Sequence, residues 1–119
     1  MELSMRLDIL KNAGQISEET YDALLRIIKM FKNKWEIELT EENGAMLITH
    51  LSIALERIKK NELVDGIEEE TYKEIKNHCQ YEQCKNIFKD IMKEAAIEIP
   101  INEETFIMMH LCALFESNN

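Results

Sequence analysis

The sequence has few residues that break helices and contains no long apolar run. Only three glycines and one proline, Pro100, occur among its 119 residues. An all-β sandwich needs a turn after about every ten residues, so this scarcity excludes that fold class. No stretch approaches the ~20 apolar residues of a membrane helix, and the first residues lack the basic region of a signal peptide. We therefore expect a cytoplasmic protein without a membrane partner.

Basic residues and cysteines are also scarce. The chain has 14 Lys and Arg against 23 Asp and Glu, which gives a formal net charge of -9. Nucleic acids and anionic membranes bind clustered Lys and Arg, so neither is an expected direct partner. The three cysteines are an odd number, which excludes a complete disulfide framework. The length corresponds to one domain.

Apolar residues instead recur at helical spacing along most of the chain. The pattern predicts an all-α fold with Ser17, Thr40 and Asn102 as N-caps. Residues 1–16 are expected to be an N-terminal extension, with a short helix through Leu3, Leu7 and Leu10. Residues 17–119 are expected to form a single domain, with helices near residues 17–34, 40–61, 68–78, 80–95 and 102–117.

The segments 37–56 and 97–116 resemble each other at a constant offset of 60 residues. Each has an extended entry, a cap, and then a histidine at the same helical phase, His50 in the first and His110 in the second. Two amphipathic helices would share apolar periodicity by default, but they would not share a histidine in register. The repeat therefore singles out His50 and His110.

Three interpretations of this histidine pair remain open at this point. The rings are structural, hydrogen-bonded and half-buried; or they bind a metal; or they accept phosphoryl groups. A metal site is disfavoured, because His50 has no second ligand at the helical spacings of three or four residues. Neutral imidazole is a nucleophile near pH 7, and Asn43, Arg57 and Glu103 are candidates to orient the rings or offset charge.

Two strings around these histidines carry a family resemblance. Residues 49–57 (THLSIALER) resemble the first histidine motif of the phosphotransferase-system regulation domain, the PRD, and residues 99–111 (IPINEETFIMMHL) resemble its second. The motifs occur in the order and at the separation found in that family. Where many members carry Asp directly before the first histidine, this chain has Thr49.

The resemblance implies a stand-alone member that folds as a compact bundle of five helices and forms a homodimer. It implies that HPr or an enzyme IIB component phosphorylates His50 and His110, and that these modifications control dimer or partner contacts. The chain has no glycine-rich phosphate loop, and no pair of catalytic carboxylates can be singled out among its many acids, so we expect no enzymatic activity and no cofactor. The alternatives are a dimeric scaffold that is not phosphorylated, and a small-molecule sensor with a pocket beside the histidines.

Other candidate features are interpreted as structural. His78, Cys79 and Cys84 match no strong zinc pattern and are expected at an exposed helix junction with incidental thiols. His78 lies outside both motifs and is expected to tolerate substitution. The methionines beside the histidines, which are Met46, Met108 and Met109, are expected to fill gaps in the core.

Overall fold

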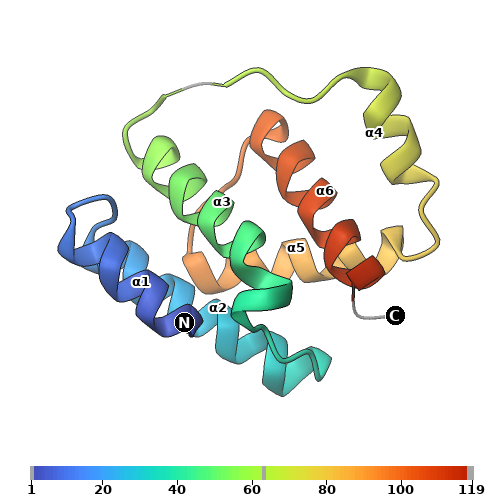
Figure 1. The fold of residues 1–119 in the computed structure, drawn as a ribbon. Helices are drawn as coiled ribbons and strands as arrows, with labels where there is room; N and C mark the ends of the chain where they lie inside the picture. Colours follow the sequence, from blue (N-terminus) through green and yellow to red (C-terminus); the bar gives the residue numbers. More distant parts are fainter. Residues whose placement is uncertain (1, 63, 118–119) are drawn as a thin grey trace.

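The part of the chain that the structure describes folds into six α-helices (Figure 1). The computed structural model describes residues 2–62 and 64–117. No strand occurs within these residues, which confirms the predicted all-α fold. The helices are α1 (Leu3–Asn12), α2 (Glu18–Trp35), α3 (Glu41–Lys59), α4 (Glu69–Lys76), α5 (Tyr81–Ala95) and α6 (Ile101–Ser117).

The predicted count of five helices in the bundle is wrong, because the N-terminal segment adds a sixth. Helix α1 packs against α2 and α3. Its Leu3 and Leu7 are buried in the same hydrophobic core as Leu24 of α2 and Ile48 of α3. Residues 1–16, expected as an extension, thus include a helix whose apolar face lies in the main core; Met1 itself is outside the described residues.

Two of the three predicted N-caps are confirmed. The hydroxyl of Ser17 accepts a hydrogen bond from the backbone N–H of Thr20 at 3.1 Å. The hydroxyl of Thr40 accepts from the N–H of Asn43 at 3.2 Å, while the Asn43 side-chain oxygen accepts from the N–H of Thr40 at 2.7 Å. This reciprocal capping box satisfies two donors that the first turn of α3 would otherwise leave unpaired.

The third predicted cap, Asn102, is wrong. Helix α6 begins one residue earlier, at Ile101, and the carbonyl of Pro100 accepts from the N–H of Glu104 at 2.9 Å. Proline suits this position because it fixes a helical φ at the start of a helix. The Asn102 side chain instead donates to the carbonyl of Val64 at 2.9 Å and ties the segment before α4 to α6.

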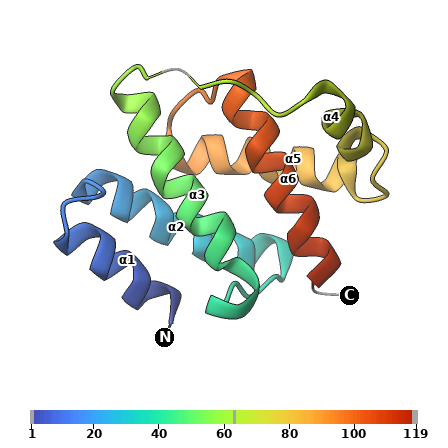
Figure 2. The ribbon, with the colours of Figure 1, turned by 45° about the horizontal axis from the view of Figure 1, so that its top comes forward.

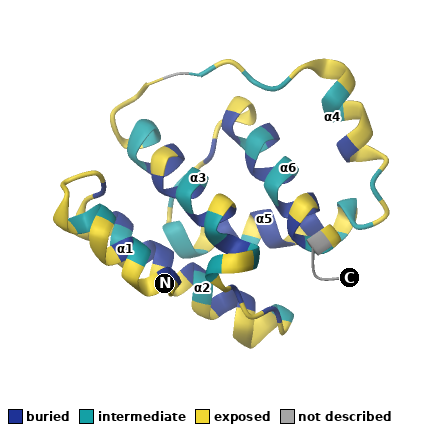
Figure 3. Ribbon diagram, viewed as in Figure 1, coloured by how far each residue is buried: buried dark blue, intermediate teal, exposed yellow. Residues whose placement is uncertain are grey.

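Helices α3 and α6 lie side by side and run in opposite directions (Figures 1 and 2). Helix α5 packs against α2 and α6, and the short α4 packs on α6. The buried positions of the helices lie mainly on the sides that face the interior (Figure 3). Phe31, Ile87 and Ile107 are fully buried in this core. This arrangement sets one face of α3 against one face of α6, and both predicted histidines lie on those faces.

Candidate functional site: a histidine pair between two antiparallel helices

The structure brings His50 of α3 and His110 of α6 together. Their ring centroids are 4.9 Å apart and their planes are inclined by 41°. Since 60 residues separate them in sequence, this contact depends on the antiparallel packing of α3 against α6. The second of the predicted bundle helices, α3, and the last, α6, thus bring the two histidine segments into one region.

Each histidine lies at the edge of its apolar stripe rather than at its centre. Beside His50, Leu47 and Ala54 are buried, whereas Met46 is 72% exposed and Ile53 is 50% exposed. The expectation that Met46 fills a gap in the core is therefore wrong. Met108 is fully buried, as expected, and Met109 is partly buried against the core.

The same boundary position recurs around His110 on α6. Ile107 and Leu114 are buried, Phe106 is half-buried and Ala113 is exposed. The repeat detected in sequence thus corresponds to two helices that each place a histidine where the core meets the surface. Both rings are half-buried.

Burial and mutual proximity favour neutral rings. Burial lowers the pKa of His50 below its ordinary value, and the nearby His110 and Arg57 lower it further, against an opposing effect of Glu103. Burial also lowers the pKa of His110. Two adjacent imidazolium ions would repel each other, so the pair is neutral near pH 7. A neutral imidazole keeps a lone pair on one ring nitrogen and is nucleophilic there.

One nitrogen of the pair lacks a protein partner. The Nε2 atom of His50 is buried and has no hydrogen-bond partner within the described residues. The ring of Phe106 lies close by, with its centroid 5.5 Å from that of His50. A buried polar atom without a hydrogen-bond partner lowers the stability of the fold by about 1–3 kcal/mol. The Nε2 atom of His50 would recover this free energy if it acquired a partner in another state of the protein.

Arg57 and Glu103 form an ion pair beside the histidines. Arg57 Nε donates to Glu103 Oε2 at 3.0 Å, and Arg57 Nη2 donates to Oε1 at 2.8 Å. Glu103 is only 2% exposed. Long side chains on a helix point towards its N-terminus, so Arg57 extends along α3 in the direction of His50. Two of the three predicted supporting residues thus lie next to the pair, and they contact each other.

Asn43, the third predicted supporting residue, has a different structural role. Its side-chain oxygen completes the capping box with Thr40, and its Nδ2 donates to the carbonyl of Glu38 at 3.1 Å. These bonds fix the start of α3, two turns before His50. Asn43 therefore positions the helix that carries the histidine.

Two contacts near the site were missed in the sequence. Arg6 of α1 forms an ion pair with Glu41, and its Nη1 donates to the hydroxyl of Thr49 at 3.4 Å. Thr49 directly precedes His50, so α1 contacts the helix at the site. The other missed contact is the one between Phe106 and His50. Phe106 lies four residues before His110 on the same helix, and this spacing was the available signal.

His78 does not join the pair. Its Nδ1 accepts from the N–H of Gln80 at 3.0 Å, and its Nε2 lies 3.3 Å from a carboxylate oxygen of Glu116. Cys79 is exposed, but Cys84 is buried, so the expectation of incidental thiols at an exposed junction is wrong for Cys84. No group of three or more His, Cys, Asp or Glu within the described residues is arranged to hold a metal ion.

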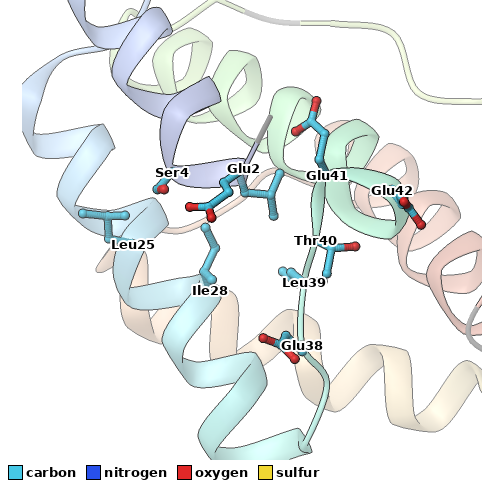
Figure 4. A pocket seen from close by; sticks show the side chains of 10 residues that line it. Glu2, Ser4, Leu25, Ile28, Glu38, Leu39, Thr40, Glu41 and Glu42 are labelled. Carbon is cyan, nitrogen blue, oxygen red and sulfur yellow. The ribbon is translucent and has the colours of Figure 1, made fainter.

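One pocket lies away from the histidines (Figure 4). It has a volume of about 710 Å³ and lies between the start of α1, helix α2 and the segment that leads into α3. Leu25 and Ile28 of α2 lie on one side, and Glu38, Leu39 and Thr40 on the other. A second pocket, of about 320 Å³, is lined by residues between Met92 and Glu98. Neither pocket is lined by His50 or His110.

None of the described helices is long and apolar enough to cross a bilayer.

Comparison with known proteins identifies the family of this chain. A curated protein of Escherichia coli (strain K12), "Uncharacterized protein YhfY", is 22% identical over 117 residues, which is 98% of each chain. No solved structure matches the chain. The family model described as PRD domain matches residues 25–114, a range that contains both histidines and the Arg57–Glu103 pair. The chain therefore belongs to the PRD domain family.

Proposed function

We propose that this protein is a regulatory module of the sugar phosphotransferase system in which His50 and His110 accept phosphoryl groups. The observation that carries the proposal is the 4.9 Å approach of the two rings at the boundary between core and surface. Membership of the PRD domain family supports the same conclusion. HPr or an enzyme IIB component is the proposed donor, and the proposal places the protein in the cytoplasm.

The chemistry requires a neutral imidazole. The lone pair of an acceptor nitrogen attacks the phosphorus of the donor, and a new P–N bond forms. The bond from phosphorus to the donor residue breaks, and its electron pair returns to the donor. Because burial lowers the pKa of both histidines, each ring has the required lone pair near pH 7.

Arg57 is the proposed cationic partner of the phosphoryl group. The modification adds up to about two negative charges beside the buried carboxylate of Glu103. Arg57 already donates to Glu103 through Nε and Nη2. Guanidinium binds phosphate strongly and at two points, so a phosphoryl group on His50 competes with Glu103 for this side chain. That competition links phosphorylation to the contact between α3 and α6.

The proposed output is a change in dimer or partner contacts. Met46 and Ile53 are exposed apolar side chains on either side of His50, and Ala113 is exposed beside His110. Exposed apolar residues that gather around a site commonly mark an interface. We propose a homodimer that uses this face, so that a phosphoryl group introduces charge at the interface.

A chemical phosphoryl donor tests acceptance without any protein partner. Purified protein is incubated with phosphoramidate, and modified residues are mapped by tandem mass spectrometry under non-acidic conditions. We expect modification at His50 or His110 that exceeds modification at His78. Modification of His78 alone would contradict the proposal.

A dimeric scaffold without phosphorylation is the second candidate. The observation that favours it is the buried, unpartnered Nε2 of His50, because a ring held in the core is a poor acceptor at that atom. The two candidates differ in one result. A scaffold stays dimeric and remains unmodified under conditions that phosphorylate a control PRD protein. The small-molecule sensor receives less support, because the two described pockets are not lined by the histidines.

A further inference from the structure

Two buried cysteines from different helices lie in contact on the opposite side of α6 from α3. The Sγ atoms of Cys84 on α5 and Cys112 on α6 are 3.9 Å apart. Cys84 is fully buried and Cys112 is 6% exposed. The third cysteine, Cys79, is exposed. The phosphoryl-acceptor proposal uses none of these thiols.

We propose that Cys84 and Cys112 form a reversible disulfide bond when the protein encounters a peroxide. A disulfide requires an S–S separation of about 2.05 Å, so the sulfur atoms must approach by about 2 Å from their present contact. The two residues belong to helices that already pack against each other. That approach requires rotation of the two side chains or a shift of α6 relative to α5.

Cys112 is the thiol that reacts first. The contact between the two sulfur atoms lowers the pKa of Cys112, and the nearby His78 lowers it further, against the effect of burial. The same contact, together with burial, raises the pKa of Cys84. The thiolate is the nucleophilic form of cysteine, so Cys112 has the reactive character and Cys84 remains the resolving thiol.

A small oxidant has to reach Cys112 near the C-terminal end of α6, where this cysteine is 6% exposed. The titratable neighbours of Cys112 are His78 and Glu116, whose side chains are 18% and 68% exposed. His78 does not act as a base for the thiol, because its Nδ1 accepts from Gln80 and its Nε2 faces Glu116. Its contribution is electrostatic.

The oxidation balances with hydrogen peroxide as the oxidant. The Cys112 thiolate attacks one peroxide oxygen, the O–O bond breaks, and a sulfenic acid forms with release of one water after protonation. The Cys84 sulfur then attacks the Cys112 sulfur, the S–O bond breaks, and a second water leaves. The two thiols together lose two electrons and two protons, and the peroxide is reduced to two molecules of water. A dithiol reductant reverses the reaction by exchange.

The disulfide would connect α5 to the helix that carries a site histidine. Cys112 lies two residues after His110 on α6. A bridge at Cys112 fixes α6 against α5 and restricts movements of α6 relative to α3. Oxidation therefore acts on the contact between the two histidine helices, although the thiols themselves lie on the other side of α6.

Intact-mass analysis of the full chain tests the proposal. Reduced protein is treated with hydrogen peroxide, quenched with catalase, denatured and alkylated. We expect a species that has lost two hydrogens and carries one alkyl group, on Cys79, with a Cys84–Cys112 peptide pair after digestion. Dithiothreitol restores three alkylated cysteines. The Cys79→Ser variant retains the bridge, whereas Cys84→Ala and Cys112→Ala lose it.

Circular dichroism shows whether the two alanine variants fold. If either does not, the peptide map of the Cys79→Ser protein still decides the result. Three alkylated cysteines after peroxide treatment would overturn the proposal. A bridge that includes Cys79, or irreversible oxidation of Cys112 without a bridge, would also overturn it. None of these outcomes bears on phosphoryl acceptance by the histidines.

Discussion

The guanidinium of Arg57 binds the carboxylate of Glu103 at two points, at 3.0 Å and 2.8 Å, and joins the end of α3 to the start of α6. The Glu103 side chain is 3% exposed, and that of Arg57 is 27% exposed. The two residues act on the pKa of His50 in opposite directions, so both lie within electrostatic range of its ring. The histidine contact and this ion pair therefore form one continuous site along the α3–α6 seam.

Removal of the arginine from this pair should destabilise the fold. In the Arg57→Met variant the Glu103 carboxylate stays buried without its cation, and we expect a loss of roughly 2–4 kcal/mol in unfolding free energy. The partial exposure of Arg57 keeps this value below that of a fully buried pair. The measurement is urea unfolding. Lys34→Met, which removes the exposed ion pair with Asp90, is the matched control and should cost less than about 1 kcal/mol. Equal losses of unfolding free energy in Arg57→Met and Lys34→Met would contradict a stabilising role for the buried Arg57–Glu103 pair.

Stability should fall as the pH drops below the ordinary pKa of histidine. The folded state lowers the pKa of His50 and His110, so the unfolded state binds more protons below about pH 6.5. The stabilisation is complete above that pH and is lost as the pH falls through the folded-state values. We expect the difference in unfolding free energy between about pH 7.5 and about pH 5.5 to shrink in a His50→Gln/His110→Gln variant. An unchanged difference would show that both rings titrate normally.

A negative charge at the histidine pair should change assembly more than the same charge elsewhere. His110→Asp adds about one negative charge at the site, as a partial mimic of a phosphoryl group. Replacement of His78 would change its contacts with Gln80 and Glu116 as well as the charge, so a residue without these contacts is the cleaner control. Asn86→Asp on the exposed face of α5 adds the same charge. We expect sedimentation to show a shift in the monomer–dimer balance for His110→Asp alone. An equal monomer–dimer balance in His110→Asp and Asn86→Asp would favour the dimeric scaffold that is not phosphorylated.

The proposed interface makes a separate prediction for Ile53. This side chain is 50% exposed on α3 next to the histidine. Ile53→Glu should weaken self-association and leave the helical content unchanged, because the side chain contributes little to the core. Met5→Glu, at a residue on α1 that is 52% exposed, is the matched control and should leave the dimer intact. A wild-type protein that is monomeric at micromolar concentrations would refute the dimer. An Ile53→Glu variant that dimerises as strongly as the wild type would refute the proposed interface.

Local signals predicted the helices well, because they act over a few residues. Ser17 and Thr40 cap their helices as expected, since a cap depends on the next three residues. The position of Asn102 in α6 was misjudged, because Pro100 provides the better helix start. The histidine pair was accessible from sequence only through the internal repeat and the family resemblance.

Contacts between distant segments could not be predicted in the same way. The contact between Cys84 and Cys112 depends on how α5 crosses α6, and neither residue carries a local signal of it. The same holds for the contact of Arg6 with Thr49, which requires α1 to pack on α3. The exposure of Met46 was also hidden, because helical spacing identifies a stripe but does not show where its edge lies.

Phosphoryl transfer from the proposed donor tests the central claim most directly. The protein is incubated with phosphoenolpyruvate, enzyme I and HPr, or with an enzyme IIB component added, and acid-labile label is mapped in the wild type, His50→Gln, His110→Gln and the double variant. The account predicts label on His50 or His110 in the wild type and none in the double variant. Absence of label under conditions that phosphorylate a control PRD protein would contradict it, as would label that persists in the double variant.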